Sequence, residues 1–253
     1  MSRFRLIMLS MLAVFAVGAV AASAASAEVA AEQQQFENAA GKEPTLKGFT
    51  SKEGVSRLTA GGAVVECKKD TDTGKLVGKE SVKEVVVKFV ECEEPTKKCP
   101  VKSTGATNPN EIVTKSLKGE LGEVNAVAGE ATSEVGLLLE GETSNVFVTL
   151  EGPAKCLPVE GPTAVEGSVV GEVTPLALAR TDKTEFLVSA GAQKIKTFER
   201  SFAAHCAGAP VARECKEDKS FKPTLSAFGG KPGTFESKDE NEFGEELKVN
   251  KGV

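Results

Sequence analysis

Residues 62–93 constrain the fold most, because they hold the most apolar run found after the first 27 residues. Alternate residues of an extended chain share a face, and the run at 83–92 follows this period of two. One face carries three large apolar side chains: Val85, Val87 and Phe89. Because Val86 and Val90 make the opposite face apolar too, the sequence predicts a central strand that is covered on both sides.

A shorter strand is predicted at 63–68. Its apolar face carries Ala63, Val65 and Cys67. Between the two strands, residues 70–74 read Asp-Thr-Asp-Thr-Gly, and these residue types tolerate left-handed backbone and bond to their own main chain. We therefore expect a turn at 70–74 that lets Cys67 approach Cys92.

The same segment has some features of a calcium-binding loop, because Asp70 and Asp72 precede Gly74. Such a loop needs glycine at its sixth position and a bidentate glutamate at its twelfth. Here the glycine falls one place early, and Ser81 stands where the glutamate should be. A plain turn is the preferred interpretation, a weak calcium site is the alternative, and no metal ligand is assigned.

The N-terminus has the pattern of a secretory signal peptide at 1–27. Arg3 and Arg5 precede an apolar run at 6–20, and two Ala-Ser-Ala triplets follow it. The run is shorter than the roughly 20 residues that a membrane-spanning helix needs. The sequence therefore predicts cleavage and a secreted protein, extracellular or associated with the cell wall, without membrane insertion.

From residue 45 onward, short apolar runs alternate with Gly, Pro, Asn and charged residues, which is typical of an all-β protein. We expect a disulfide-stabilised antiparallel β-sandwich or barrel with little helix. The expected strands lie at 56–59, 63–68, 75–77, 83–92, 111–117, 135–140, 146–150, 165–173, 185–189, 194–198 and 246–249. The expected divisions are a flexible tether at 28–44, a main β domain at 45–180 and a smaller C-terminal β region at 181–253. Whether that last region shares the main core is left open.

Six cysteines in an exported chain predict three disulfides: Cys67, Cys92, Cys99, Cys156, Cys206 and Cys215. Fifteen pairings exist for six cysteines. Local closure favours Cys67 with Cys92, Cys99 with Cys156, and Cys206 with Cys215. A zinc site built from His205, Cys206, Cys215 and Glu214 is the alternative for the last pair, but the spacing is not that of a zinc knuckle.

Motifs for catalysis are missing from the sequence. It contains no Gly-x-Ser-x-Gly, no His-Glu-x-x-His, no phosphate-binding loop and no second histidine. Several glutamates could form a carboxylate pair for glycoside hydrolysis, and none is singled out: Glu120, Glu123, Glu130 and Glu134. We therefore assign no catalytic residue and no cofactor, and we expect the protein not to be an enzyme.

The charge balance limits the partners. The whole chain has a net charge of −5, and loss of Arg3 and Arg5 with the signal peptide leaves 29 basic and 36 acidic residues, a net −7. A negatively charged chain binds nucleic acid or anionic lipid poorly, because both carry negative charge too. Trp and Tyr are absent, so phenylalanine is the only one of these three aromatic side chains that could stack on a sugar.

Several segments together resemble a group of uncharacterised secreted proteins that are abundant in some actinobacteria: GGAVVECKKDTDTG, VVVKFVECEE, EIVTKSLKGELGEV and VGLLLE. The resemblance covers about residues 45–175 and extends to the final EELKVN. It implies a bacterial, secreted, β-rich protein and no particular activity. The pair Cys206 and Cys215 departs from the pattern of the group.

These observations predict a secreted, non-catalytic surface or binding module with an extracellular or cell-surface ligand. One alternative is a secreted hydrolase that uses carboxylates. Another is a protease inhibitor that presents the loop between Cys206 and Cys215. Converging carboxylates in a cleft would favour the hydrolase, and an exposed rigid loop would favour the inhibitor.

Overall fold

The computed structural model describes residues 35–45, 48–52, 54–124, 134–153, 155–157, 161–174, 181–188, 198–200 and 224–250. They contain strands and turns and no helix. The expected signal peptide at 1–27 lies outside them. Residues 33–253 form one compact unit, and the strands of the C-terminal region at 181–253 pair with strands of the main domain. The expected boundary near residue 180 therefore does not divide the sheet.

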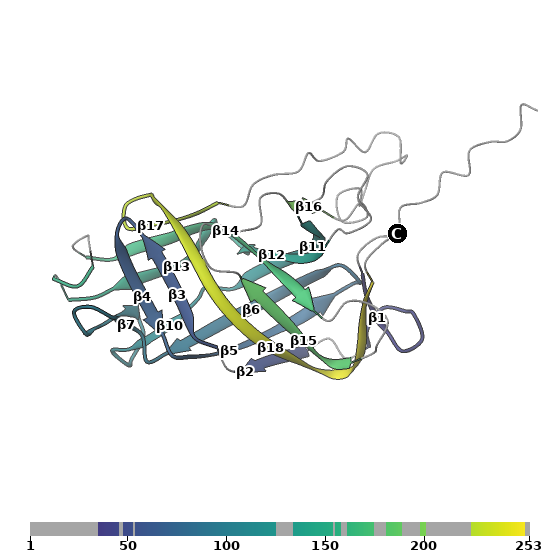
Figure 1. Cartoon of the computed structure of the whole chain (residues 1–253). Coiled ribbons are helices and arrows are strands. Elements are labelled where there is room, and N and C mark those ends of the chain that lie inside the picture. The colour runs from purple at the N-terminus through teal and green to yellow at the C-terminus, as the bar shows by residue number, and fades with distance from the viewer. Residues whose placement is uncertain are drawn as a thin grey trace, which may run out of the picture. The chain divides into compact units, whose positions relative to one another are not determined.

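All strand pairings are antiparallel, which confirms the predicted all-β class (Figure 1). The strands are β1 (Gln35–Asn38), β2 (Gly48–Lys52), β3 (Ser56–Ala60), β4 (Ala63–Cys67), β5 (Lys69–Val77), β6 (Ser81–Val90), β7 (Glu93–Glu94), β8 (Cys99–Pro100), β9 (Lys102–Ser103), β10 (Glu111–Val113), β11 (Leu117–Val124), β12 (Glu134–Gly141), β13 (Val146–Glu151), β14 (Thr163–Thr174), β15 (Thr181–Val188), β16 (Phe198–Arg200), β17 (Leu225–Ala227) and β18 (Lys231–Asn250).

The pairings close into a ring of eight strands. Its order is β18, β2, β5, β6, β11, β12, β14 and β15, and β15 pairs back onto β18. Closure removes the free sheet edges that an open sheet would expose along these strands. It also gives the ring an interior, where the inward side chains of all eight strands meet.

Two long strands continue beyond the ring into a second layer of pairing. The first residues of β18 pair with β3 and β17, and the first residues of β14 pair with β13 and β17. From β3 the pairing extends to β4, β7 and β8, and from β13 to β9. Figure 1 shows β18, in yellow, running from the β17 end of the molecule to β1. Strands β14 and β18 therefore belong to both the ring and the second layer of pairing.

The expected turn at 70–74 is wrong, because these residues lie inside β5. Burial along β5 alternates strictly, and the inward residues are Asp70, Asp72, Gly74 and Leu76. Gly74 is required there: a Cβ on it would lie 2.4 Å from the Phe49 ring. The chain reverses instead at 78–80, where Gly78 has a φ of +66°, before pairing back along β6.

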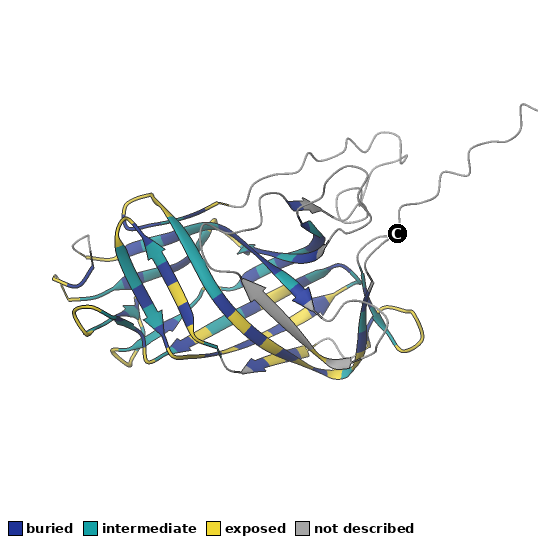
Figure 2. Ribbon diagram, viewed as in Figure 1, coloured by how far each residue is buried: buried dark blue, intermediate teal, exposed yellow. Residues whose placement is uncertain are grey.

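The expected tether at 28–44 is wrong for residues 35–38. They form β1 and pair with the end of β18, from Gln35 opposite Asn250 to Asn38 opposite Leu247. Burial explains the ordering, because the Phe36 side chain is only 3% exposed and its ring lies 6.4 Å from that of Phe243. Figure 2 shows the alternation of buried and exposed residues along β18 that makes this packing possible.

Two disulfides join Cys67 to Cys92 and Cys99 to Cys156, the pairs that local closure predicts. The Cα atoms are 4.0 and 5.8 Å apart, respectively. Loops of 25 and 57 residues correspond to about 3.5 and about 4 kcal/mol of stabilisation by restricting the unfolded chain. Cys206 and Cys215 lie outside the described residues.

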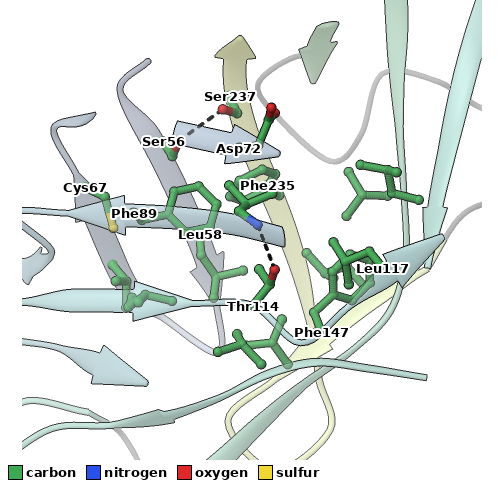
Figure 3. A pocket seen from close by; sticks show the side chains of 18 of the residues that line it. Ser56, Leu58, Cys67, Asp72, Phe89, Thr114, Leu117, Phe147, Phe235 and Ser237 are labelled. Atoms are coloured by element: carbon green, nitrogen blue, oxygen red, sulfur yellow. Dashed lines mark hydrogen bonds between the residues drawn. The ribbon is translucent and has the colours of Figure 1, made fainter. Parts of the chain in front are cut away.

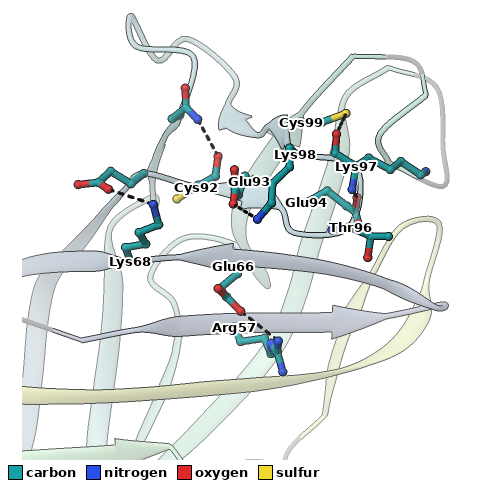
Figure 4. A network of polar contacts seen from close by, with 12 residues as sticks. Arg57, Glu66, Lys68, Cys92, Glu93, Glu94, Thr96, Lys97, Lys98 and Cys99 are labelled. Atoms are coloured by element: carbon teal, nitrogen blue, oxygen red, sulfur yellow. Dashed lines mark hydrogen bonds and ion pairs between the residues drawn. The ribbon is translucent and has the colours of Figure 1, made fainter.

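Charged side chains on β3, β4, β7 and the turn after β7 pair with one another (Figure 4). Arg57 contacts Glu66 and Lys98 contacts Glu93, each at 3.0 Å. Exposed ion pairs of this kind contribute at most about 1 kcal/mol each. This face is therefore a solvated surface of the sheet.

Candidate functional site

Three aspartates meet inside the protein. Asp70 and Asp72 point inward from β5, and Asp239 points inward from β18. Their exposed fractions are 1%, 8% and 6%, respectively. Acids are almost never buried to this extent without a charged partner, so the cluster is the most unusual chemical feature of the described residues.

The crossing of the chain from β2 to β3 explains where the cluster lies. β2 pairs with β5 on one side and β18 on the other, and after it ends at Lys52 the chain crosses to β3. A Cβ on Gly54 would lie 3.2 Å from Oδ2 of Asp70, 3.3 Å from Oδ1 of Asp239 and only 2.5 Å from the Lys238 carbonyl oxygen. Glycine is therefore needed at this crossing, and the two acids approach it from either side.

Two serine hydroxyls contact the cluster. Ser56 donates to Oδ2 of Asp70 at 2.6 Å, and Ser237 donates to Asp239 at 3.1 Å from Oδ1. The two hydroxyl oxygens are 3.0 Å apart (Figure 3). Each hydroxyl carries one proton, so the pair can satisfy at most two of the carboxylate oxygens at one time.

Two carboxylate oxygens remain without a hydrogen bond. They are Oδ1 of Asp70 and Oδ1 of Asp72, both fully buried. Within the part of the chain that the structure describes, no lysine or arginine forms an ion pair with any of the three acids. A buried carboxylate in this state carries a large desolvation cost, which is paid either by protonation or by a bound partner.

The pKa values of two of the acids follow from this environment. Burial raises the pKa of Asp72 from 3.8 to about 6; the charge of Asp70 adds to the rise, and hydrogen bonds from Ser51 oppose it. Burial also raises the pKa of Asp239, from 3.8 to about 9, helped by the charge of Asp70 and a hydrogen bond to it. At pH 7 Asp239 therefore keeps its proton, and most Asp72 side chains are ionised.

The cluster borders a cavity of about 100 Å³ in the interior. Figure 3 shows Ser56, Ser237 and Asp72 at one end of this cavity and Leu117 and Phe147 at the other. Most of the remaining lining is aliphatic or aromatic. A cavity with one polar end and an apolar body has the general character of a small-molecule site.

A second cavity, of about 40 Å³, lies on another side of Asp72. Phe36, Phe49 and Phe243 form part of its wall. Asp72 lines both cavities, so this side chain stands between two apolar spaces.

A larger hollow of about 550 Å³ lies beside the loop at 103–107. Several of its lining residues are solvent-exposed loop residues, such as Thr104, Gly105 and Thr107. No buried polar side-chain atom lacking a partner faces it among the described residues. It therefore offers no feature that selects a ligand.

The other candidate residues from the sequence do not converge on a site. Glu120 and Glu123 are half-buried on β11, and Glu134 begins β12 opposite Val124. Five further candidates lie outside the described residues: Glu130, His205, Cys206, Glu214 and Cys215. Among the described residues, no group of three acids, histidines or cysteines has an arrangement that could hold a metal ion.

Sequence reasoning missed Asp239, Ser237 and Ser56 as members of a site. A signal was present in Ser-Lys-Asp-Glu-Asn-Glu-Phe at 237–243, where every second residue leads to Phe243. An inward phenylalanine predicts that Ser237 and Asp239 point inward too, because residues two apart share a face.

No protein-family model, curated protein or solved structure matches this chain. In the described ranges, no helix is long and apolar enough to cross a membrane. The function is therefore inferred from the geometry of the interior.

Proposed function

We propose that the protein is a secreted, non-catalytic module that binds a small ligand in the interior cavity beside Asp72. The supporting observation is the cavity of about 100 Å³ with Asp72 in its wall and one oxygen of that carboxylate unpartnered. Strands of the ring enclose this cavity together with β3, β4, β10, β13 and β17.

Secretion is supported by the two disulfides and by the N-terminal pattern at 1–27. Disulfides persist in oxidising compartments and are rare in the cytosol. The proposed location is therefore extracellular or at the cell wall.

A hydrolase is the second candidate, because the pKa values of Asp72 and Asp239 differ, at about 6 and about 9. Acid and base roles are commonly divided between carboxyl groups with separated pKa values. Access argues against it: the acids are at most 8% exposed, and the adjoining cavity of about 100 Å³ is too small for a sugar or peptide unit.

The test combines turnover with binding. Mature, oxidised protein is expected to show no turnover on esterase, peptidase and polysaccharide panels between pH 5 and 8. It is expected to bind 1-butanol saturably in a calorimetric titration, with micromolar affinity at best, because ligands gain no more than about 1.5 kcal/mol per non-hydrogen atom.

A variant that fills the cavity provides the control. Val169 lines the cavity on β14, and Val169→Phe is expected to abolish 1-butanol binding. Val87→Leu, a smaller change on β6, is expected to weaken 1-butanol binding, and it serves as the control if Val169→Phe fails to fold. Turnover that disappears in Asp72→Asn would favour the hydrolase, and absence of any 1-butanol binding would refute interior binding.

A further inference from the structure

We infer that the ligand held in the interior cavity is a small primary ammonium ion with a short apolar body, whose nitrogen binds against the Asp72 carboxylate. This inference rests on the proposed interior binding and adds the chemical class of the ligand. It follows from the charge, the unpartnered oxygens and the size of the cavity.

The charge of the cluster calls for a cation. Asp70 and Asp72 both bring negative charge into an interior where no lysine or arginine of the described residues pairs with them. A carboxylate accepts hydrogen bonds and donates none, and the free oxygens are Oδ1 of Asp70 and Oδ1 of Asp72. An ammonium group supplies three donors together with the missing positive charge, whereas an alcohol supplies one donor and no charge.

A ligand in the cavity can reach Asp72, because this residue is part of the cavity wall. Its side chain is more than nine-tenths buried and lines the cavity of about 100 Å³, together with Asp239 and Ser237. Asp239 keeps its proton and Ser237 has a hydroxyl, so neither repels an approaching cation as a second bare carboxylate would.

The size of the cavity limits the apolar part of the ligand. An interior cavity of about 150 Å³ accommodates benzene, with six carbon atoms. The cavity here is about 100 Å³, with a further 40 Å³ on another side of Asp72. A chain of about four carbons fits this space, and Leu117, Phe147 and their neighbours provide an apolar wall for it.

Two other occupants fit less well. A divalent cation needs several converging ligands, and the described residues contain no suitable group of three. Ordered water fits the space and can hydrogen-bond to Asp72, but it leaves the charge uncompensated. Water is therefore the occupant that the ammonium ion has to displace, and its persistence is one outcome of the test.

The binding is expected to depend on pH through Asp72. The groups around it are Asp70 on its own strand, Asp239 on β18, Ser51 on β2 and Val87 on β6, so the titratable neighbours are both acids. An ammonium ion binds the ionised form of Asp72, and affinity should rise between pH 5 and pH 8, where a primary amine stays protonated.

The experiment compares n-butylammonium chloride with 1-butanol by isothermal titration calorimetry at pH 8 and constant ionic strength. The full-length oxidised protein is expected to bind the cation at least tenfold more tightly than the alcohol. In Asp72→Asn this preference is expected to vanish. In Glu240→Gln, which removes an exposed acid of β18, it should persist.

The outcomes separate the two proposals. If 1-butanol binds and n-butylammonium binds no more tightly, the ammonium inference fails and interior binding stands. If neither binds, water fills the site and both fail. If the preference survives in Asp72→Asn, the cation sits elsewhere and the inference is overturned. Should Asp72→Asn not fold, a wild-type affinity that does not rise between pH 5 and 8 would overturn it equally.

Discussion

Replacing Asp239 by asparagine is expected to raise the melting temperature at pH 8 by several degrees. The pKa of Asp239 is raised from 3.8 to about 9, so between these values the folded protein binds a proton that the unfolded chain has released. Stability conferred by that proton is complete below about pH 4 and is lost as pH rises toward 9. Each pH unit in this window costs up to about 1.4 kcal/mol. Asparagine keeps the shape and cannot ionise, so Asp239→Asn should escape the loss.

Thermal melts of wild type and Asp239→Asn at half-unit steps from pH 4 to 9 measure the effect. Glu240→Gln is the matched control, because it removes an acid one residue away that is exposed and pairs with Lys183. The control should keep the slope of the wild type. A variant Asp239→Asn that is no more stable than wild type at pH 8 would show that Asp239 is ionised in the folded protein.

Ending the chain at Gly244 is expected to lower the melting temperature by roughly 10 °C. The truncation removes Leu247 and Val249, which are 1% and 2% exposed, and the segment of β18 that pairs with β1. Loss of two buried aliphatic side chains costs at least about 4 kcal/mol. For a chain of this size, each kcal/mol lowers the melting temperature by about 2–4 °C.

Point variants show whether burial is the cause. Leu247→Ala in the full-length chain should reproduce about half of the loss, and Glu246→Gln, at an exposed position, should change little. An unchanged melting temperature after truncation would mean that the pairing of β1 with the end of β18 does not stabilise the fold.

The parts of the fold that could be predicted from sequence are those with a local signal. The apolar alternation at 83–92 predicted the central strand β6, and the structure places β5 on one side of it and β10 and β11 on the other. Val85 and Phe89 are buried as predicted, whereas Val86 and Val90 are half-buried, so the second face is only partly covered.

The expected turn at 70–74 is wrong because two sequence signals conflict there. Asp, Thr and Gly favour a turn, yet every second residue also leads to Leu76, which is 1% exposed. Turn preferences assume that acids face water. Here Asp70 and Asp72 face inward because pairing with β2 and β6 fixes the register of β5. This long-range pairing leaves no pattern in the sequence of residues 70–74.

Ring closure could not be predicted, because it depends on partners far apart in the chain. Strand β2, near the start of the chain, lies between β5 and β18, and β15 pairs back onto β18. The sequence predicts only residues 246–249 of β18 as a strand, although β18 runs from Lys231 to Asn250 and changes partners along its length. The acid cluster was missed for the same reason, since it forms only when β5 and β18 meet across Gly54.

A pH titration of the aspartate side-chain carboxyl carbons by NMR tests directly whether a charged cluster is buried inside the protein. Buried Asp72 and Asp239 predict two titration steps of the cluster, near pH 6 and near pH 9, well above the ordinary aspartate value of 3.8. Asp72→Asn and Asp239→Asn should each remove one step. Titration of every aspartate near pH 4 would contradict burial of the cluster, because it would place all of these carboxylates in contact with water.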